Sequence, residues 1–482
     1  MIKILLIEPA KILTDIKKDS YNFQKYVWPS LGLMSIGTTL NENGFLVKYF
    51  SPNQDLKNWR SKLKNLLIEY QFNYVGISNT TYTIGFDMVI AYFVKEILPK
   101  TTIITGGYFS HVYPKTILQH TEVDIVIRGE GELPFLKIVK GEKNLAKIPG
   151  VCFRYFQQKQ EKYFIQNPYF MDKSEFEKIP PINFSLYDYH KIWRKWPKEL
   201  KRNIQIYTSK GCPFCCRFCS VPYFNDKKLR FLSLETTKKN ITNAAYLGAT
   251  EIHISDPNFN AQQKHCFSIC DSIIKFKKNR IIPTNLSFSA QVRIETINNS
   301  LLRKMAKAGF NCLMIGIENI SPRLLKDDIN KKYYLDKEKV LEKINLIRSY
   351  DISPYIYLIL GIPTTTFEEV VENIYFADFL MKRGIKIDLN PFITPFPETE
   401  YYEIYKKTPF IVWEKVNFMR LKNNQQVKYS MKIPRSLKPI NDDVRKYLRL
   451  LWFKTNRIVH KRGNDFPRTF INEAIKMIKI TR

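Results

Sequence analysis

The first 150 residues alternate short apolar runs with longer stretches in which apolar residues recur every three or four positions. Apolar runs of three to six residues predict buried β-strands, and the helical periodicity between them predicts amphipathic helices. The predicted strands cover residues 3–7, 46–50, 74–78, 102–105 and 124–127, with helices expected over 31–43 and 86–98. Strands that alternate with helices in this way favour an α/β domain, over residues 1–150, built on a doubly wound parallel sheet.

The predicted strand ends of this sheet carry polar residues and glycines. Ligands of doubly wound sheets bind beyond the carboxyl ends of the strands, and glycines there let a ligand approach the backbone closely. The residues that we single out at these ends are Glu8, Ser78, Thr80, Gly106, Gly107, Glu130 and Glu132. No Gly-x-Gly-x-x-Gly motif follows the first strand, so the sequence does not indicate a dinucleotide site.

A second alternating series starts near residue 205 and has a different spacing. Strand-like runs are found at residues 205–208, 251–255, 286–290, 312–317, 355–360 and 386–389, with helical patterns between them. Six βα units in about 200 residues predict a partial (βα)6 barrel over residues 201–400, an incomplete version of the eightfold barrel. The chemistry of such barrels is located at the C-terminal ends of the strands.

The remaining segments have weaker patterns. Residues 151–200 contain Pro180-Pro181 and many aromatic residues, and we expect an irregular linker that packs across both neighbouring domains. Residues 401–482 are expected to form a small, mostly helical C-terminal segment. A chain of 482 residues is long enough for roughly three domains.

Composition and charge narrow the class of protein. No run of 18 apolar residues occurs, so no transmembrane helix is expected, and the N-terminal apolar burst reads as a first strand rather than a signal peptide. We therefore expect a cytoplasmic protein. The net charge of +31 favours an anionic partner such as nucleic acid or a membrane surface. Abundant Lys, Asn, Ile, Tyr and Phe with few glycines can equally reflect an A/T-rich genome.

Four of the eight cysteines lie within eight residues of one another, directly after the first strand of the second series. Cys212, Cys216 and Cys219 have the spacing Cys-x3-Cys-x2-Cys, and Cys215 lies between them. Three thiolates on one short loop can hold three irons of a four-iron cluster and leave the fourth iron open for another ligand. A zinc site through Cys212 and Cys215 remains an alternative, although no second Cys-x2-Cys pair follows at a suitable spacing.

The cysteine loop and five later segments resemble the radical S-adenosylmethionine (SAM) enzymes. The family hallmark is this cysteine spacing with an aromatic residue before the last cysteine, here Phe218. The segments 230–235, 256–259, 290–293, 316–322 and 361–363 are similar to family motifs that follow the cluster loop and the later barrel strands. The resemblance implies a [4Fe-4S] cluster on the three cysteines and a SAM site that includes Phe218, Asp256, Gln291, Arg293, Glu318, Asn319 and Gly361.

The N-terminal region resembles the cobalamin-binding domain of the cobalamin-dependent class within this family. The resemblance rests on Gly32-Leu33 after Trp28-Pro29, on Gly106-Gly107 with His111, and on the segment from Val123 to Glu132. It implies a Rossmann-like domain in which Ser78, Thr80, Gly106, Gly107 and Glu130 line the cobalamin. The first 150 residues contain no Asp-x-His-x-x-Gly motif, so no histidine is expected to ligate the cobalt.

The resemblance also implies a mechanism, in which the open iron binds SAM and one electron cleaves it to a 5′-deoxyadenosyl radical. We expect a cobalamin-dependent methyltransferase that acts on an unactivated carbon of a small metabolite or a peptide, with an electron donor such as flavodoxin or ferredoxin. An oxidative cyclase or rearrangement enzyme is the first alternative. A tRNA-modifying methylthiotransferase is more remote, because only Cys152 precedes the motif, and nucleic acid is not expected as a partner. A non-enzymatic iron–sulfur module would leave five active-site motifs without a role.

Several other residues have a structural and a functional interpretation. Cys266 and Cys270 share a predicted helix face and are expected in the core, and Cys215 is expected not to ligate the cluster. His111 either faces the cofactor or caps a loop. Residues 411–482 hold 18 Lys and Arg against 5 Asp and Glu. We expect a helix there to pack on the barrel through residues that include Trp452 and Phe453; recognition of an anionic partner is the alternative.

Overall fold

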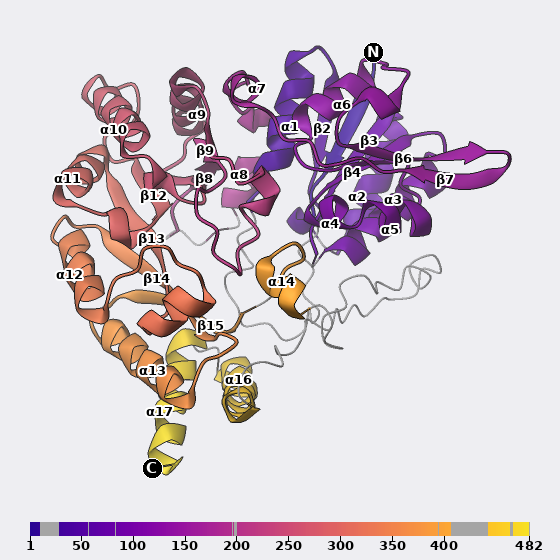
Figure 1. Cartoon of the computed structure of the whole chain (residues 1–482). Coiled ribbons are helices and arrows are strands. Elements are labelled where there is room, and N and C mark those ends of the chain that lie inside the picture. The colour runs from indigo at the N-terminus through magenta and orange to yellow at the C-terminus, as the bar shows by residue number, and fades with distance from the viewer. Residues whose placement is uncertain are drawn as a thin grey trace.

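The computed structural model describes residues 1–9, 28–55, 57–81, 83–194, 196, 200–393, 395–405, 442–462 and 466–481. Figure 1 shows two α/β domains side by side, the first built from the N-terminal third of the chain and the second from its middle, with helices from the C-terminal end packed on the second. This arrangement confirms the α/β fold class, with a doubly wound domain followed by a partial barrel.

The first sheet has the strand order β2-β1-β3-β4-β5-β6-β7, and β1 to β5 run parallel. Its strands are β1 (Lys3–Ile7), β2 (Leu46–Phe50), β3 (Tyr74–Asn79), β4 (Thr102–Gly107), β5 (Ile125–Ile127), β6 (Val151–Gln157) and β7 (Gln160–Phe164). The strand order reverses between β1 and β3, which is the point where open α/β sheets bind their ligands. Its helices are α1 (Leu31–Glu42), α2 (Trp59–Tyr70), α3 (Ile84–Ile97), α4 (Tyr108–Val112), α5 (Pro114–His120) and α6 (Glu132–Val139).

The segment expected to be an irregular linker begins with a β-hairpin. Strand β6 pairs antiparallel with β5, and β7 pairs with β6, so the first sheet extends to residue 164. Gln158 and Lys159 turn the hairpin in left-handed backbone conformations, with φ of 51° and 62°. Asn-Gly or Asp-Gly usually occupies such turns, and its absence here removed the sequence signal. Two short helices, α7 (Lys173–Glu177) and α8 (Tyr189–Trp193), follow the hairpin.

The second sheet has six parallel strands in the order β15-β14-β13-β12-β11-β8. Its strands are β8 (Asn203–Ile206), β11 (Glu251–Ile254), β12 (Ser287–Val292), β13 (Phe310–Glu318), β14 (Ser353–Gly361) and β15 (Lys386–Phe392). The helices that cover its outer side are α9 (Leu234–Tyr246), α10 (Gln263–Lys278), α11 (Asn299–Ala308), α12 (Lys337–Arg348) and α13 (Phe367–Lys382) (Figure 1). A two-stranded ribbon, β9 (Ser209–Lys210) with β10 (Arg230–Phe231), follows β8.

Local sequence signals fix the ends of these helices. Helix α13 begins with a capping box, in which the Thr366 side chain accepts from the amide of Glu369 and the Glu369 carboxylate accepts from the amide of Thr366. Helix α11 begins at an Asn298 cap and ends at Gly309, whose φ of 95° suits glycine. These caps define where the helices begin and end, and so limit the length of the loops that connect them to the barrel strands.

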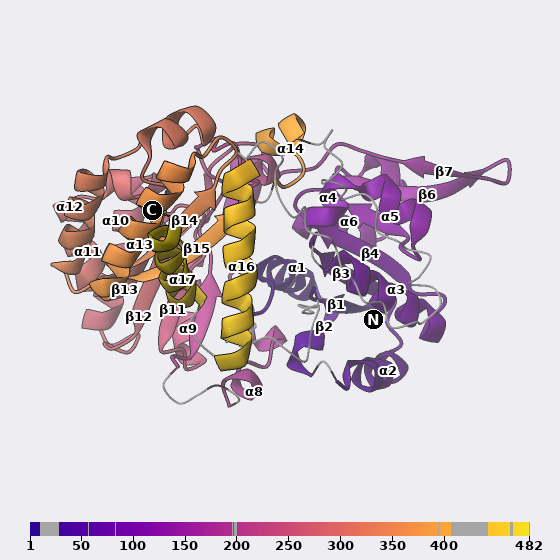
Figure 2. The same cartoon turned by 90° about the horizontal axis from the view of Figure 1, so that it is seen from below.

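The C-terminal helices pack on the barrel. Helix α16 (Asp442–Arg462) packs against β14 of the barrel (Figure 2), and α17 (Phe466–Thr481) packs on both α13 and α16. Val444, Leu448 and Leu451 are fully buried. Trp452 is 40% exposed, so the prediction that it anchors the helix is wrong, and Phe453 lies outside the side chains that the structure describes. None of the described helices is long and apolar enough to cross a membrane.

Candidate functional site

The cysteine loop starts where β8 ends, at the C-terminal rim of the barrel. The ribbon β9–β10 closes the base of the loop, with Ser209 opposite Phe231 and Lys210 opposite Arg230. Gly211 lies between the ribbon and Cys212, with φ of 90°, and a Cβ atom there would stand 1.9 Å from the carbonyl oxygen of Lys228. Only glycine fits this close backbone crossing.

Asp256, two residues after the end of β11, fixes the start of this loop. Its Oδ1 accepts from the amides of Thr208 at 2.6 Å and Ser209 at 3.1 Å, and its Oδ2 accepts from their hydroxyls at 2.6 and 2.7 Å. Burial raises the pKa of this carboxyl, while the hydrogen bonds from Thr208 and Ser209 oppose the rise. The carboxylate predicted to contact SAM is thus occupied in holding the segment that leads into Cys212.

The three cysteines of the motif lie partly buried, whereas Cys215 is exposed. Burial raises the pKa of the Cys212 and Cys216 thiols and that of Cys219 to about 12. In the part of the chain that the structure describes, no three His, Cys, Asp or Glu side chains gather closely enough to hold a single metal ion. A four-iron cluster does not require the three thiolates to meet at one metal ion, because each thiolate ligates a separate iron atom.

Positive charge from Arg293, directly after β12, and from Lys331, after β13, lies next to these thiols. Arg293 stacks over the ring of Phe214, which is inside the cysteine loop, with its guanidinium carbon 3.9 Å from the ring centroid. Glu295 pairs with Arg293 at 3.2 Å and with the buried Lys331 at 3.1 Å. Arg293 and Lys331 both oppose the burial that raises the pKa of Cys216. Glu295 and Lys331 were not predicted, since neither is part of a recognised motif.

Glu318 ends β13 in a strained conformation. Its φ is 69°, which is uncommon for a residue other than glycine, and the register between β13 and β14 shifts between Gly316 and Glu318. A Cβ atom at Gly316 would lie 2.3 Å from Glu318 Oε1, so the glycine makes room for this carboxylate. Burial raises the pKa of Glu318, and Lys331 and Arg293 oppose the rise. The predicted residues Arg293 and Glu318 therefore lie together beside the cysteine loop.

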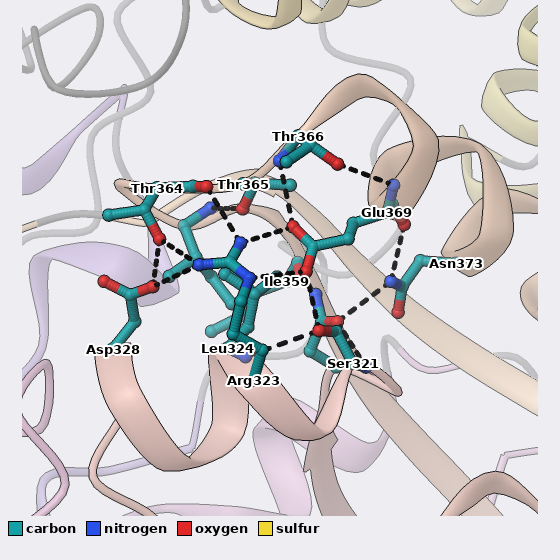
Figure 3. A network of polar contacts seen from close by, with 12 residues as sticks. Ser321, Arg323, Leu324, Asp328, Ile359, Thr364, Thr365, Thr366, Glu369 and Asn373 are labelled. Carbon is teal, nitrogen blue, oxygen red and sulfur yellow. Dashed lines mark hydrogen bonds and ion pairs between the residues drawn. The ribbon is translucent and has the colours of Figure 1, made fainter.

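Asn319 is fully buried and bonded to protein groups. Its amide nitrogen donates to the Ile359 carbonyl at 3.0 Å, and its oxygen accepts from the Ser321 amide and from Asn373 Nδ2, both at 2.9 Å. Ser321 in turn donates to Glu369 (Figure 3). Like Asp256, Asn319 fixes segments at the ends of the barrel strands. Its side-chain oxygen and its side-chain nitrogen both have protein partners.

A polar network supports the segment behind the cysteine loop. Arg323 donates to Glu369 Oε2 at 2.6 Å and to Thr364 Oγ1 at 2.9 Å, and Thr364 donates to Asp328 (Figure 3). These bonds hold a single π-helical turn, Leu324–Asp328, against the loop after β14. The carbonyl oxygen of Ile329 accepts from the Arg217 amide at 3.0 Å. The network therefore extends to the backbone between Cys216 and Phe218.

The remaining predicted residues of the barrel occupy different environments. Phe218 packs partly buried against the barrel core. Gln291, on β12, is partly exposed and pairs in register with Met314. Gly361 ends β14, where a Cβ atom would stand 2.5 Å from the Pro391 carbonyl oxygen.

A cavity of about 270 Å³ opens at the strand ends of the first sheet. Ser78, Gly106, Gly107 and Glu130 line it, together with residues of α1. Thr80 is not among the lining residues, and its amide instead bonds to Thr83 Oγ1 at 2.9 Å. A Cβ atom at Gly106 would meet only the Ile127 carbonyl oxygen, at 3.7 Å, so this glycine keeps space open. A glycine-lined cavity at a topological switch point suits a nucleotide-like group.

The cavity wall also contains residues of the cysteine loop and its base, namely Lys210, Phe224 and Asn225. Lys210 Nζ lies 3.1 Å from Glu132 Oε1 and 3.3 Å from Glu130 Oε1. Burial alone would raise the pKa of Glu132, but Lys210 holds it below its usual range. Glu130 Oε2 accepts from Arg230 Nη1 at 2.7 Å. The two domains thus meet in a buried cluster of two acids and two bases.

A second contact between the domains involves His111, at the end of α4. Its Nε2 lies 3.0 Å from Glu398 Oε2, and its ring packs against Phe224 in a tilted arrangement, with centroids 4.4 Å apart. Tyr108 OH donates to the Pro397 carbonyl at 2.6 Å. His111 is buried in this contact and does not line the cavity.

Two protein families match the two domains. The B12 binding domain matches residues 24–139, and the Radical SAM superfamily matches residues 206–377. A radical SAM domain works with SAM and a [4Fe-4S] cluster and a B12 binding domain with cobalamin, so the three cofactors predicted from the sequence are confirmed.

Individual relatives match over most of the chain. An uncharacterised methyltransferase of Pyrococcus horikoshii is 25% identical over 379 residues, which is 78% of each protein. The bacteriochlorophyllide d C-8(2)-methyltransferase of Chlorobaculum tepidum is 24% identical over 73% of this chain and 74% of its own. The solved structure of the radical SAM methyltransferase TsrM from Kitasatospora setae, with cobalamin and a [4Fe-4S] cluster, superimposes with a TM-score of 0.71. It covers 84% of this chain and 78% of that chain at 17% identity, which shows a shared fold.

Proposed function

The chain belongs to the cobalamin-dependent radical SAM enzymes, and we propose that it is a methyltransferase that acts on an unactivated carbon of a small metabolite or a peptide. The relatives from Pyrococcus and Chlorobaculum carry the name methyltransferase, which supports this choice over oxidative cyclisation.

One structural observation carries the proposal. The base of the cysteine loop and the cavity of the first domain share residues, because Lys210, Phe224 and Asn225 line a cavity whose other walls include Gly106 and Gly107. The cluster loop therefore borders the cavity proposed for cobalamin. A methyl carrier and a radical generator must work on one substrate, so their binding regions need to adjoin in this way.

The residues proposed for the cluster and SAM have distinct tasks. Cys212, Cys216 and Cys219 would hold the [4Fe-4S] cluster, which supplies an electron to SAM when bound. Arg293 and Glu318 lie beside the thiols, and we assign to them the contacts with the charged groups of SAM; Phe218, Gln291 and Gly361 complete the proposed site.

Asp256 and Asn319 belong to the SAM site through the segments that they hold. Asp256 fixes Thr208 and Ser209, which lead into the cysteine loop. Asn319 joins the ends of β13 and β14 to α13. We therefore assign both as positioning residues.

The cobalamin would lie against Ser78, Gly106, Gly107 and Glu130, with Thr80 shaping the adjacent turn through its bond to Thr83. No histidine lines the cavity among the described residues, so the chain offers no imidazole to the cobalt there. A one-electron donor such as flavodoxin or ferredoxin completes the proposal. We place the enzyme in the cytoplasm, where eight thiols such as these remain reduced.

The test is to reconstitute the full chain anaerobically and to add SAM, hydroxocobalamin and a chemical reductant. We expect binding of hydroxocobalamin without a histidine ligand in the paramagnetic resonance spectrum of Co(II). We also expect SAM cleavage that is lost in Cys212→Ala, Cys216→Ala and Cys219→Ala. Candidate substrates are then screened for a mass increase of one methyl group. A product with a new ring and no added methyl would overturn the methyltransferase proposal.

A further inference from the structure

Three buried charged side chains and one partly buried lysine form a contact between the cobalamin-binding domain and the base of the cysteine loop. Glu130 comes from the turn between β5 and α6, Glu132 is the first residue of α6, and Lys210 and Arg230 come from the two strands of the ribbon. The side chains of Glu130, Glu132 and Arg230 are 7%, 3% and 4% exposed, and that of Lys210 is 22% exposed. Opposite charges therefore balance one another in a region with little water.

The charged side chains of this ion-pair cluster, Glu130, Glu132, Lys210 and Arg230, have additional partners that fix their positions. Arg230 Nη1 donates to the Met171 carbonyl at 2.6 Å as well as to Glu130. Glu132 Oε1 accepts from Ser35 at 2.8 Å, which joins it to α1. Buried ion pairs are sensitive to displacement because a separated charge loses its partner without regaining water. A shift of the turn with Glu130 and Glu132 is therefore transmitted to the ribbon.

Lys210 connects the two proposed cofactor regions. Glu130, Glu132 and Lys210 line the cavity of the first domain. Lys210 is also two residues before Cys212 and pairs in register with Arg230, so it closes the loop that carries all three motif cysteines. Between them lies only Gly211, whose backbone crosses that of Lys228 closely. Movement of Lys210 therefore acts directly on the first cluster ligand.

We propose that Lys210 is a positioning residue that couples cobalamin binding to the ordering of the cysteine loop. The inference rests on the proposed function. Ordering a loop and its side chains costs conformational entropy, and the first ligand that fixes the ion-pair cluster bears this cost. The second ligand then binds to a region that is already ordered. By thermodynamic reciprocity, the [4Fe-4S] cluster strengthens cobalamin binding by the same factor as cobalamin strengthens binding of the [4Fe-4S] cluster.

The experiment measures the affinity of the full chain for hydroxocobalamin by absorbance titration, with the cluster reconstituted and with the cluster removed by chelation. We expect the cluster to tighten binding by about 10-fold, within the usual range of such couplings. In Lys210→Met the ratio should fall to about 1–2, and Lys210→Arg should keep most of it because its guanidinium can still pair with both acids. Hydrogen exchange of residues 211–229 should slow on addition of hydroxocobalamin in the parent protein and not in Lys210→Met.

Two further variants separate coupling from simple damage. Lys304→Met removes an ion pair with Asp271 on the outer helices, at 2.8 Å, and should keep the parental ratio. The double variant Lys210→Met with Glu132→Gln leaves no unpaired charge at that position, and it should fold well yet show no coupling. A parental ratio near 1, or an undiminished ratio in both Lys210→Met and the double variant, would overturn the coupling while leaving the proposed function intact. Failure of the cluster-loaded parent to bind hydroxocobalamin at all would overturn both.

Discussion

The substitution Gly211→Ala should prevent the cysteine loop from holding its cluster. The added Cβ would stand 1.9 Å from the Lys228 carbonyl oxygen, whereas real Cβ contacts essentially never fall below 3.0 Å. Backbone on one side of the crossing must therefore move by more than 1 Å. Because the contacted atom belongs to the backbone, a change of side-chain rotamer cannot relieve the clash.

The cost has two parts. The left-handed conformation of residue 211 costs roughly 1–2 kcal/mol for alanine. The displacement also separates the ribbon, where Lys210 faces Arg230 and Ser209 faces Phe231. Loss of about two backbone hydrogen bonds adds roughly 2 kcal/mol. A local penalty of about 3–4 kcal/mol is enough to populate an open loop in place of the closed one.

Gly384→Ala is the matched control. Gly384 also has a positive φ, of 76°, but a Cβ atom there would meet nothing within 4 Å. It should cost only the conformational part, about 1–2 kcal/mol. Cluster binding by the two variants is measured as iron and sulfide content after anaerobic reconstitution, and by the electron paramagnetic resonance spectrum of the reduced cluster. If Gly211→Ala bound as much iron per chain as Gly384→Ala, the reasoning about the backbone crossing would be refuted.

Three further predictions address other parts of the molecule. Cys215→Ala should retain most of the iron and Cys216→Ala should lose it, and equal losses would show that the ligands are wrongly assigned. Burial lowers the pKa of His253 to about 4, so the unfolded chain binds the extra proton and the free energy of unfolding should fall by up to about 3 kcal/mol as pH drops from 6.5 towards 4. Urea titrations at pH 7 and pH 5 should show a smaller loss in His253→Gln, and an unchanged loss would contradict this origin. Leu448→Ala should destabilise the fold by about 2–5 kcal/mol in thermal unfolding, and the 60% exposed Leu450, on the same helix, should tolerate alanine.

Short apolar runs separated by helical periods located every parallel strand of the two sheets to within a few residues. Strands buried on both faces read as continuous apolar runs, and helices between them keep a clear period, so the sequence carries this information locally. The hairpin β6–β7 lacked both signals. Its outer residues are exposed, and Gln158-Lys159 replaces the usual glycine turn. The sequence also did not show which side chains of α16 are buried. The structure buries Leu448 and Leu451 and leaves Trp452 exposed.

The residue types of the site were also visible in the sequence, and their partners were not. The spacing of Cys212, Cys216 and Cys219 fits a cluster in any context, because three thiolates on one loop are sufficient to suggest it. The spacing could not show that Asp256 holds Thr208 and Ser209 in place, 48 and 47 positions away.

The sequence by itself determined the parallel strands of both sheets, the cysteine motif and the glycines at the strand ends, since each depends on neighbouring residues. Only the tertiary structure decided how the cofactor regions adjoin. Lys210 meets Glu132 across 78 positions, and Arg230 meets Glu130 across 100. The physical reason is that a buried charge needs an opposite charge nearby in space, and the packing of the two domains, not the order of residues along the chain, supplies it.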